Sequence, residues 1–268
     1  LARRVECVSG SVTFDVLMRP GRRGDTVNPY HSTIGKQTVF NVGTVLGLFL
    51  HSPELEMDWS DECVSGRFEM REGEKRTLAI VVCSDGPLVV PSIEEIDERI
   101  DISDNEWRVW ADRVAYDGQN RHAFLRSALA LKLLLFSPSG AIAAAPTTSL
   151  PEKIGGPKNY DYRYAWVRDA GYTIKAFLAA GAEAEAKAAF SWLLDQIEEH
   201  GTQVCYALDG GPVSGVHEWA MPGYQGSKPV VTGNVAAKQR QHGVYGDIFE
   251  TASRFVERGN ILDNRSAA

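Results

Sequence analysis

The hydrophobic period of the chain changes from two to 3.6 near residue 90, and this change limits the possible folds more than any other feature. Before it, apolar and polar residues alternate at 12–18 and 64–70, and residues 44–50 form an apolar run of β-forming residues. Each of the three predicts a short strand. A further run at 77–83 is apolar on both faces and predicts a central strand. We therefore expect a multidomain chain, with an antiparallel β-sandwich followed by an all-α part.

Three ranges follow from this division. Residues 1–92 are expected to form a partial N-terminal β-sandwich, residues 93–120 a helical linker, and residues 121–268 the helical domain. In and near the linker, the spacing predicts one or two amphipathic helices, with Asp104 or Asn105 as the cap of the second if there are two.

The helical domain carries four predicted helices. The first, at 121–137, is apolar on so much of its circumference that we expect it to be well buried. Helices at 166–180 and 182–200 form a hairpin around Gly181, and a last helix runs from the cap Asn234 to about residue 258. Repeated helical hairpins with long loops suggest a toroid of helices.

Composition excludes several classes of protein. The net charge of −7 argues against nucleic-acid binding, and no apolar run is long enough for a membrane span. The four cysteines are widely spaced, so we expect no metal site and no disulfide framework, which favours a cytoplasmic location. Because the chain opens on Leu1 in mid-pattern with no initiator Met, we expect it to be a fragment. A toroid needs more helices than the four or so predicted here, so we also expect truncation at the C-terminus.

The segment from Asn159 to Gly171, called the aromatic segment here, reads NYDYRYAWVRDAG and mixes aromatic rings with two arginines and two aspartates. Charged side chains are rarely buried without partners, so this mixture is unusual for a core. Flat rings can stack on the apolar faces of a pyranose, while Arg and Asp bond its hydroxyls. The alternative is a structural Arg–Asp pair at a helix start, with the aromatics packed beneath it.

Two long runs carry a family resemblance. APTTSLPEKIGGPKNYDYRYAWVRDA, from Ala145 to Ala170, and GYQGSKPVVTGNVAAKQRQHGVYGD, from Gly223 to Asp247, resemble the signatures of glycoside hydrolase family 15. This family contains glucoamylases, glucodextranases and bacterial or archaeal trehalases. The resemblance implies a β-sandwich followed by an (α/α)6 toroid. It also implies an α-glucosidic oligosaccharide, a polysaccharide or trehalose as the substrate, with no cofactor.

The resemblance also implies which residues bind sugar. Arg168 and Asp169 would bond the outer hydroxyls of the non-reducing glucose, and Tyr162 and Trp166 would be stacking walls, with Arg163 and Tyr164 as supporting groups. The second pocket loop would contribute Tyr224 and Ser227. The chain departs from the family pattern at Gly243, where Asp is common, and at Asp247, where Glu is usual.

The resemblance implies hydrolysis from the non-reducing end with inversion, which needs a carboxylic acid and a carboxylate base about 6.5–9.5 Å apart. We expect both catalytic glutamates beyond residue 268 and assign neither here, so the chain alone should be close to inactive. Glu152, Glu218 and Asp247 are the nearest carboxylates and are interpreted as loop or surface charges. A phosphorylase-type enzyme and a non-catalytic carbohydrate-binding module remain alternatives. A phosphorylase would need a cluster of basic residues to bind phosphate near the pocket mouth. Lys153, Lys158 and Lys228 form only a sparse cluster of this kind.

Overall fold

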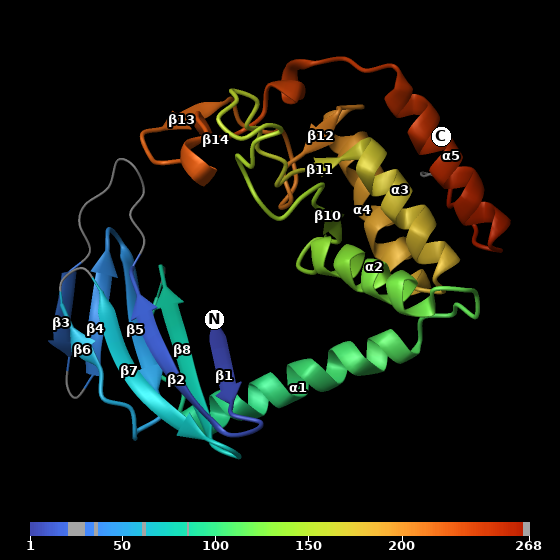
Figure 1. The fold of residues 1–268 in the computed structure, drawn as a ribbon. Helices are drawn as coiled ribbons and strands as arrows, with labels where there is room; N and C mark the ends of the chain where they lie inside the picture. The colour runs from blue at the N-terminus through green and yellow to red at the C-terminus, as the bar shows by residue number, and fades with distance from the viewer. Residues whose placement is uncertain (21–29, 35–36, 61–62, 85, 265–268) are drawn as a thin grey trace. The chain divides into compact units, whose positions relative to one another are not determined.

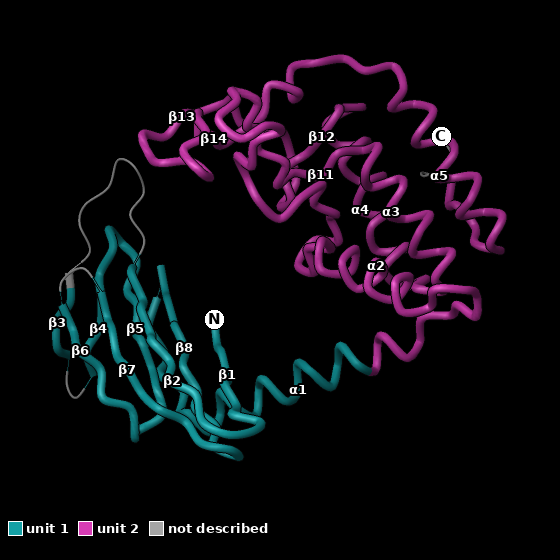
Figure 2. The backbone as a smooth tube through the Cα atoms, viewed as in Figure 1, with its two compact units in different colours: residues 1–108 teal, residues 109–268 magenta. Residues whose placement is uncertain are grey.

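The computed structural model describes residues 1–20, 30–34, 37–60, 63–84 and 86–264. The chain forms two compact units, residues 1–108 and residues 109–268, which Figure 2 shows in two colours. Antiparallel sheets make up most of the first unit, and helices joined by long loops make up most of the second (Figure 1).

Two antiparallel sheets build the first unit. The order of the five-stranded sheet is β1 (Ala2–Glu6), β8 (Lys75–Cys83), β5 (Val45–His51), β4 (Gln37–Val42) and β3 (Tyr30–Ile34). The order of the three-stranded sheet is β2 (Ser11–Met18), β7 (Val64–Arg71) and β6 (Asp58–Trp59). Met18 and Val64 from the smaller sheet pack with Phe40 and Phe49 from the larger one, so both sheets share one core.

The four predicted strands are β2, β5, β7 and β8, and β8 is an interior strand between β1 and β5. The pattern does not predict β1, β3, β4 or β6. Strand β1 reads ARRVE, with little alternation, and its place depends on pairing with β8. A partner distant in sequence thus decides β1, whereas β3, β4 and β6 pair with strands next to them in the chain.

One continuous helix, α1 (Ile93–Asp112), follows the strands. A capping box starts it: the Ser92 backbone N–H donates to Glu95 Oε2 at 2.8 Å, and the Glu95 N–H donates to Ser92 Oγ at 3.1 Å. Asp104 caps no second helix, because it lies inside α1 and accepts a bond from Arg108 one turn later. The linker therefore holds a single helix rather than two.

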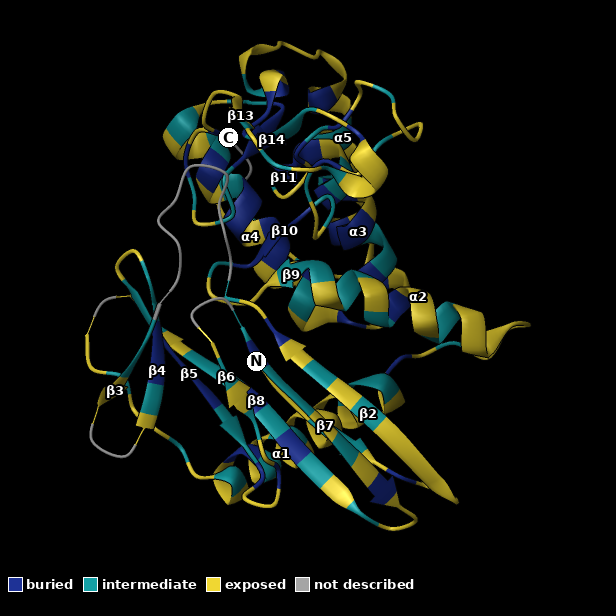
Figure 3. Cartoon of the chain, turned by 60° about the vertical axis from the view of Figure 1, so that its left-hand side comes forward, coloured by how far each residue is buried: buried dark blue, intermediate teal, exposed yellow. Residues whose placement is uncertain are grey.

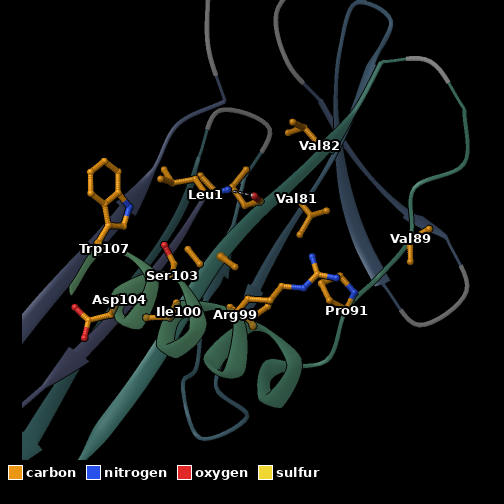
Figure 4. A pocket seen from close by; sticks show the side chains of 14 residues that line it. Leu1, Val81, Val82, Val89, Pro91, Arg99, Ile100, Ser103, Asp104 and Trp107 are labelled. Atoms are coloured by element: carbon orange, nitrogen blue, oxygen red, sulfur yellow. Dashed lines mark hydrogen bonds between the residues drawn. The ribbon is translucent and has the colours of Figure 1, made fainter. Parts of the chain in front are cut away.

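A groove of about 860 Å³ lies within the first unit, where the end of β8 faces α1 (Figure 4). Its lining is largely apolar, and Leu1, Val82 and Val89 are all more than half exposed. The Leu1 ammonium donates to the Ile80 carbonyl at 2.8 Å at one end of the groove.

The second unit contains α2 (Arg121–Leu134), α3 (Val167–Ala179), α4 (Glu183–His200) and α5 (Gly243–Glu257). Helix α3 packs against both α4 and α5. The α3–α4 hairpin turns at Gly181, whose φ of +75° suits glycine. Buried side chains concentrate on α3 and α4 (Figure 3), with Ile174, Phe177, Phe190 and Leu193 in the main core. None of the helices among the described residues is both long and apolar enough to cross a membrane.

Two helix predictions need correction. Ala128 is the one buried residue of α2, and Leu133 is 68% exposed, because α2 packs through one side only in the described part of the chain. The last helix does not begin at Asn234. Asn234 instead caps the short 3₁₀ helix η2 (Val235–Lys238) through a bond from the Ala236 N–H to its Oδ1, and α5 begins at Gly243.

Candidate functional site

The first half of the aromatic segment is extended and runs antiparallel to the loop before it. The Ser149 N–H donates to the Tyr160 carbonyl at 2.9 Å, and the Ala145 N–H donates to the Tyr162 carbonyl at 3.0 Å. The segment then enters the two-residue strand β11 (Ala165–Trp166) and continues directly into α3. This pairing holds the rings in one place before the helix begins.

Trp166 anchors the segment to the unit's interior. In β11 it is paired with Cys205 of β12 (Cys205–Tyr206), and its side chain is 6% exposed. Its ring packs in a second apolar cluster with Val204, Val213 and Ala236. Trp166 is therefore a buried support for its neighbours.

Tyr162 offers the open ring of the segment. It is 40% exposed, and its ring centroid lies 5.4 Å from that of Trp166 behind it and 6.0 Å from that of Tyr160. Partial burial and the nearby Glu152 carboxylate raise the pKa of Tyr162, so its phenol stays neutral at physiological pH. A neutral phenol can both donate and accept a hydrogen bond.

Arg168 and Asp169 occupy the first turn of α3. Arg168 Nη2 lies 3.2 Å from Asp169 Oδ2, and their side chains are 56% and 37% exposed. A carboxylate at a helix N-terminus is favoured by the helix dipole, whereas a guanidinium there is not. The pair thus leaves donors and acceptors open to a ligand. Both charges also act on the pKa of the Tyr162 phenol, which Asp169 raises and Arg168 lowers.

A polar cavity of about 410 Å³ lies beside the start of α3. It is lined by residues 202–204 and 237–245, including Gln203, Gln239 and Tyr245. Val204 belongs to this lining, and its carbonyl accepts the Val167 N–H at 3.1 Å, which places the cavity next to the strand-to-helix junction. Its volume falls within the range of about 300–1,000 Å³ typical of small-molecule sites.

The two residues predicted from the second loop have different surroundings. Tyr224 is 54% exposed, in a turn between β13 (His217–Trp219) and β14 (Val230–Thr232). Ser227 is fully buried, and its Oγ accepts the Gly155 N–H at 2.9 Å. Ser227 therefore links two loops, and its hydroxyl is not exposed to a ligand in this structure.

The other local carboxylates have ordinary surroundings. Glu152 is 55% exposed and lies 3.5 Å from Lys158 Nζ. Glu218 is exposed in β13, and the Asp247 backbone carbonyl accepts the Thr251 hydroxyl inside α5. These surroundings agree with the interpretation of Glu152 and Glu218 as loop or surface charges, while Asp247 is half-buried on α5.

Sequence reasoning assigns no role to Asp161, which the structure makes the most buried charge of the segment, with 0% of its side chain exposed. Its one local signal is Arg163 two residues later, which forms an ion pair with it. Its other partners are Gly233 and Asn234, more than seventy residues along the chain, so no short motif reveals them.

Comparison with known proteins identifies relatives of this chain. The model of glycosyl hydrolases family 15 matches residues 118–267. A trehalase of Mycobacterium tuberculosis is 32% identical over 268 residues, covering 94% of this chain and 38% of that protein. A trehalase of Thermoplasma acidophilum is 38% identical over 167 residues, covering 62% of this chain and 29% of that protein.

A crystal structure of a bacterial glucoamylase complexed with acarbose has a similar fold. Its TM-score is 0.54 at 14% sequence identity, and the match covers 74% of this chain and 35% of the glucoamylase. The chain therefore spans between about a quarter and two fifths of the length of these relatives. Because the family model covers more than half of the residues, the chain belongs to glycosyl hydrolases family 15.

Proposed function

We propose that this chain provides the glucose-binding wall of an inverting α-glucoside hydrolase that acts from the non-reducing end of its substrate. One observation carries the proposal: the half-exposed Tyr162 ring and the accessible Arg168–Asp169 pair flank the junction of β11 and α3 in a family 15 chain. Rings and charges in one accessible place are what recognition of a sugar requires.

The roles follow from burial. Tyr162 stacks on an apolar face of the glucose, and the buried Trp166 ring holds it from behind. Arg168 donates to the outer hydroxyls of the glucose and Asp169 accepts from them, since charge-assisted bonds are stronger than neutral ones. Tyr224 extends the wall from its exposed turn, and Ser227 supports that turn by holding Gly155.

The helices α2 to α5 form the beginning of an (α/α)6 toroid in this proposal. The α3–α4 hairpin, with α5 packed on α3, is the kind of helix pairing such a toroid repeats. The likeness to the bacterial glucoamylase supports this arrangement at the level of fold.

The chemical step requires a proton donor to the leaving oxygen and a base for the attacking water. The proposal gives neither role to a carboxylate of this chain. Glu152 is engaged with Lys158, and Asp169 is assigned to the sugar hydroxyls. This chain's part is to bind and orient the glucose so that its anomeric carbon faces those groups.

Trehalose is the first substrate to test, because the relatives at 32% and 38% identity are trehalases. Glucose release by the protein carrying this chain would be measured from trehalose, maltose, isomaltose and starch, with the first anomer identified by proton NMR. From trehalose, inversion is expected to release one β-glucose, from the attacked unit, and one α-glucose, from the leaving unit. Release of α-glucose alone would contradict inversion, and sugar phosphate formed only with added phosphate would indicate a phosphorylase.

A matched pair of variants separates the wall from the fold. Tyr162→Ala removes the open ring and is expected to reduce affinity for the substrate. Tyr172→Ala removes a more open tyrosine, 61% exposed on α3 beside Lys175, and should leave affinity unchanged. Equal affinity in the two variants would contradict the assignment of Tyr162.

A further inference from the structure

Asp161 is a buried charge that the proposed sugar contacts do not use. Its side chain is 0% exposed, whereas the next residue, Tyr162, is 40% exposed. Neighbouring side chains of an extended backbone point to opposite sides, so an inward Asp161 directs Tyr162 outward. A buried carboxylate is stable only when partners satisfy its oxygens.

The Asp161 carboxylate is fully engaged. Arg163 Nε donates to Oδ1 and Arg163 Nη2 donates to Oδ2, both at 2.9 Å, in a two-pronged ion pair. The Arg163 backbone N–H adds a bond to Oδ1 at 3.2 Å. The Gly233 N–H, from a distant part of the chain, donates to Oδ2 at 3.2 Å. This environment also raises the pKa of Arg163, chiefly through its hydrogen bonds to Asp161.

The distant loop is attached at more than one point. Asn234 Nδ2 donates to the Asp161 carbonyl at 2.8 Å, and the Gly233 N–H is shared with the Tyr164 hydroxyl at 3.1 Å. Asp161 therefore contacts residues 233–234 with both its side chain and its backbone. These bonds tie the aromatic segment to the loop that leads into the cavity lining at 237–245.

Gly233 makes this close approach possible. Its φ is +81°, and a Cβ atom there would lie 2.2 Å from the Gly215 carbonyl oxygen. A larger residue would push the backbone N–H away from Asp161. The Gly233 backbone N–H can therefore reach the buried Asp161 carboxylate because residue 233 has no side chain.

We infer that Asp161 is a positioning residue for glucose binding: it locks the aromatic segment to the loop at residues 233–234 and so holds Tyr162 at the angle at which it stacks on the sugar. The inference rests on the proposed function. Asp161 does not touch the sugar itself, and it acts through Tyr162.

The test is a double-mutant cycle on the protein carrying this chain, with kcat and KM for trehalose and the thermal midpoint measured for each variant. The single variants are Asp161→Asn and Tyr162→Ala. Asp161→Asn keeps an acceptor for Gly233 but loses the ion pair with Arg163, and kcat/KM should fall by up to about 10²-fold. If Asp161 acts through Tyr162, the double variant loses no more than Tyr162→Ala alone.

Glu185→Gln is the matched control, since Glu185 is also a partly buried, ion-paired carboxylate of the second unit. It should lower the thermal midpoint without changing kcat/KM. Arg163→Lys provides a second variant if Asp161→Asn does not fold. Lysine keeps the positive charge but cannot donate the two parallel hydrogen bonds that the guanidinium makes to Asp161. It is expected to reduce kcat/KM in the same direction.

The outcomes separate the two proposals. Additive losses in the double variant, or a loss of kcat/KM in Asp161→Asn no larger than in Glu185→Gln, would overturn the positioning role and leave the glucose wall intact. Unchanged kcat/KM in Tyr162→Ala would overturn the wall itself, and the positioning role with it.

Discussion

Lys132 Nζ of α2 lies 2.5 Å from Glu185 Oε1 of α4, and Trp110 Nε1 donates to the same oxygen at 2.9 Å. The two charged side chains are 27% and 12% exposed. One carboxylate oxygen therefore joins α2 and α4 to the end of α1. Helix α2 is also attached through Ala128 and partly buried apolar side chains, so this contact adds a polar link to an apolar one.

Glu185→Gln should destabilise the second unit. The amide leaves the Lys132 ammonium without its counter-charge, and hydrogen bonds to charged groups contribute about 1.5–3 kcal/mol each. We expect the free energy of unfolding to fall by about 1–3 kcal/mol, measured by urea denaturation. The exposed pair formed by Arg254 and Glu257 on α5 is the control, and Glu257→Gln should change stability by less than about 1 kcal/mol.

The same contact predicts a dependence on pH. Burial alone would raise the pKa of Glu185, but the bonds from Lys132, its own backbone and Trp110 outweigh burial and leave the pKa below its ordinary value. A carboxyl whose folded pKa is depressed stabilises the fold above its unfolded pKa of about 4.3 and loses this contribution as pH falls through the folded pKa. Below that pH, the thermal midpoint of Glu185→Gln should thus fall less steeply than that of the parent protein. Parallel curves of thermal midpoint against pH would contradict the depressed pKa of Glu185.

Gly171 lies where α3 meets α5. A Cβ there would come within 2.7 Å of the buried Thr251 Oγ1. Overpacking costs about 1–3 kcal/mol, whereas replacing glycine by alanine in a helix gains up to about 1 kcal/mol. Gly171→Ala should therefore lower the thermal midpoint, yet raise it when Thr251→Ala is already present. The same sign in both backgrounds would show that the contact does not limit packing.

Asp169→Ala tests the sugar contact. An unpaired glucose hydroxyl and a lone Arg168 should reduce transition-state stabilisation by about 1–3 kcal/mol, seen as a lower kcat/KM. Asp169→Asn should lose less kcat/KM than Asp169→Ala, because the amide oxygen still accepts a hydrogen bond. An Asp169→Ala enzyme within about twofold of the parent would exclude a direct role.

Cys205 reports on the integrity of β11 and β12. Burial raises the pKa of the Cys205 thiol to about 11, so at pH 8 only about one thiol in a thousand is ionised. Iodoacetamide should label Cys63 and Cys83, which are partly exposed, well before Cys205. Mass spectrometry of labelled peptides would measure the order, and rapid labelling of Cys205 in the folded chain would show that β11 opens.

Local patterns account for much of the fold. Ile174, Phe177 and Leu178 are spaced at the helical period, and all three are buried in α3 as that spacing predicts. Strand β8 is likewise evident from its continuous apolar run. Alternation and helical spacing are properties of neighbouring residues, which is why the sequence contains them directly.

Features that depend on distant partners were not predictable in this way. The apolar content of α2 predicts burial, but burial depends on what packs against it, and Leu133 is exposed. Asn234 has the chemistry of a helix cap, but its side chain also bonds Asp161, and the long helix starts nine residues later at Gly243. In the candidate site, Tyr162, Arg168 and Asp169 are neighbours in sequence, while the buried Ser227 accepts a hydrogen bond from Gly155, 72 residues earlier.

The bond between Gly233 and Asp161 joins residues 72 positions apart. Closing so long a loop costs entropy before any contact is gained, whereas the α3–α4 hairpin closes over a few residues. During synthesis, the hairpin can assemble as soon as it leaves the ribosome, but Asp161 has only its local partner Arg163 until residues 233 and 234 have emerged. The face that carries Tyr162 is therefore expected to be among the last parts of the second unit to mature, and the nascent chain to acquire sugar affinity late.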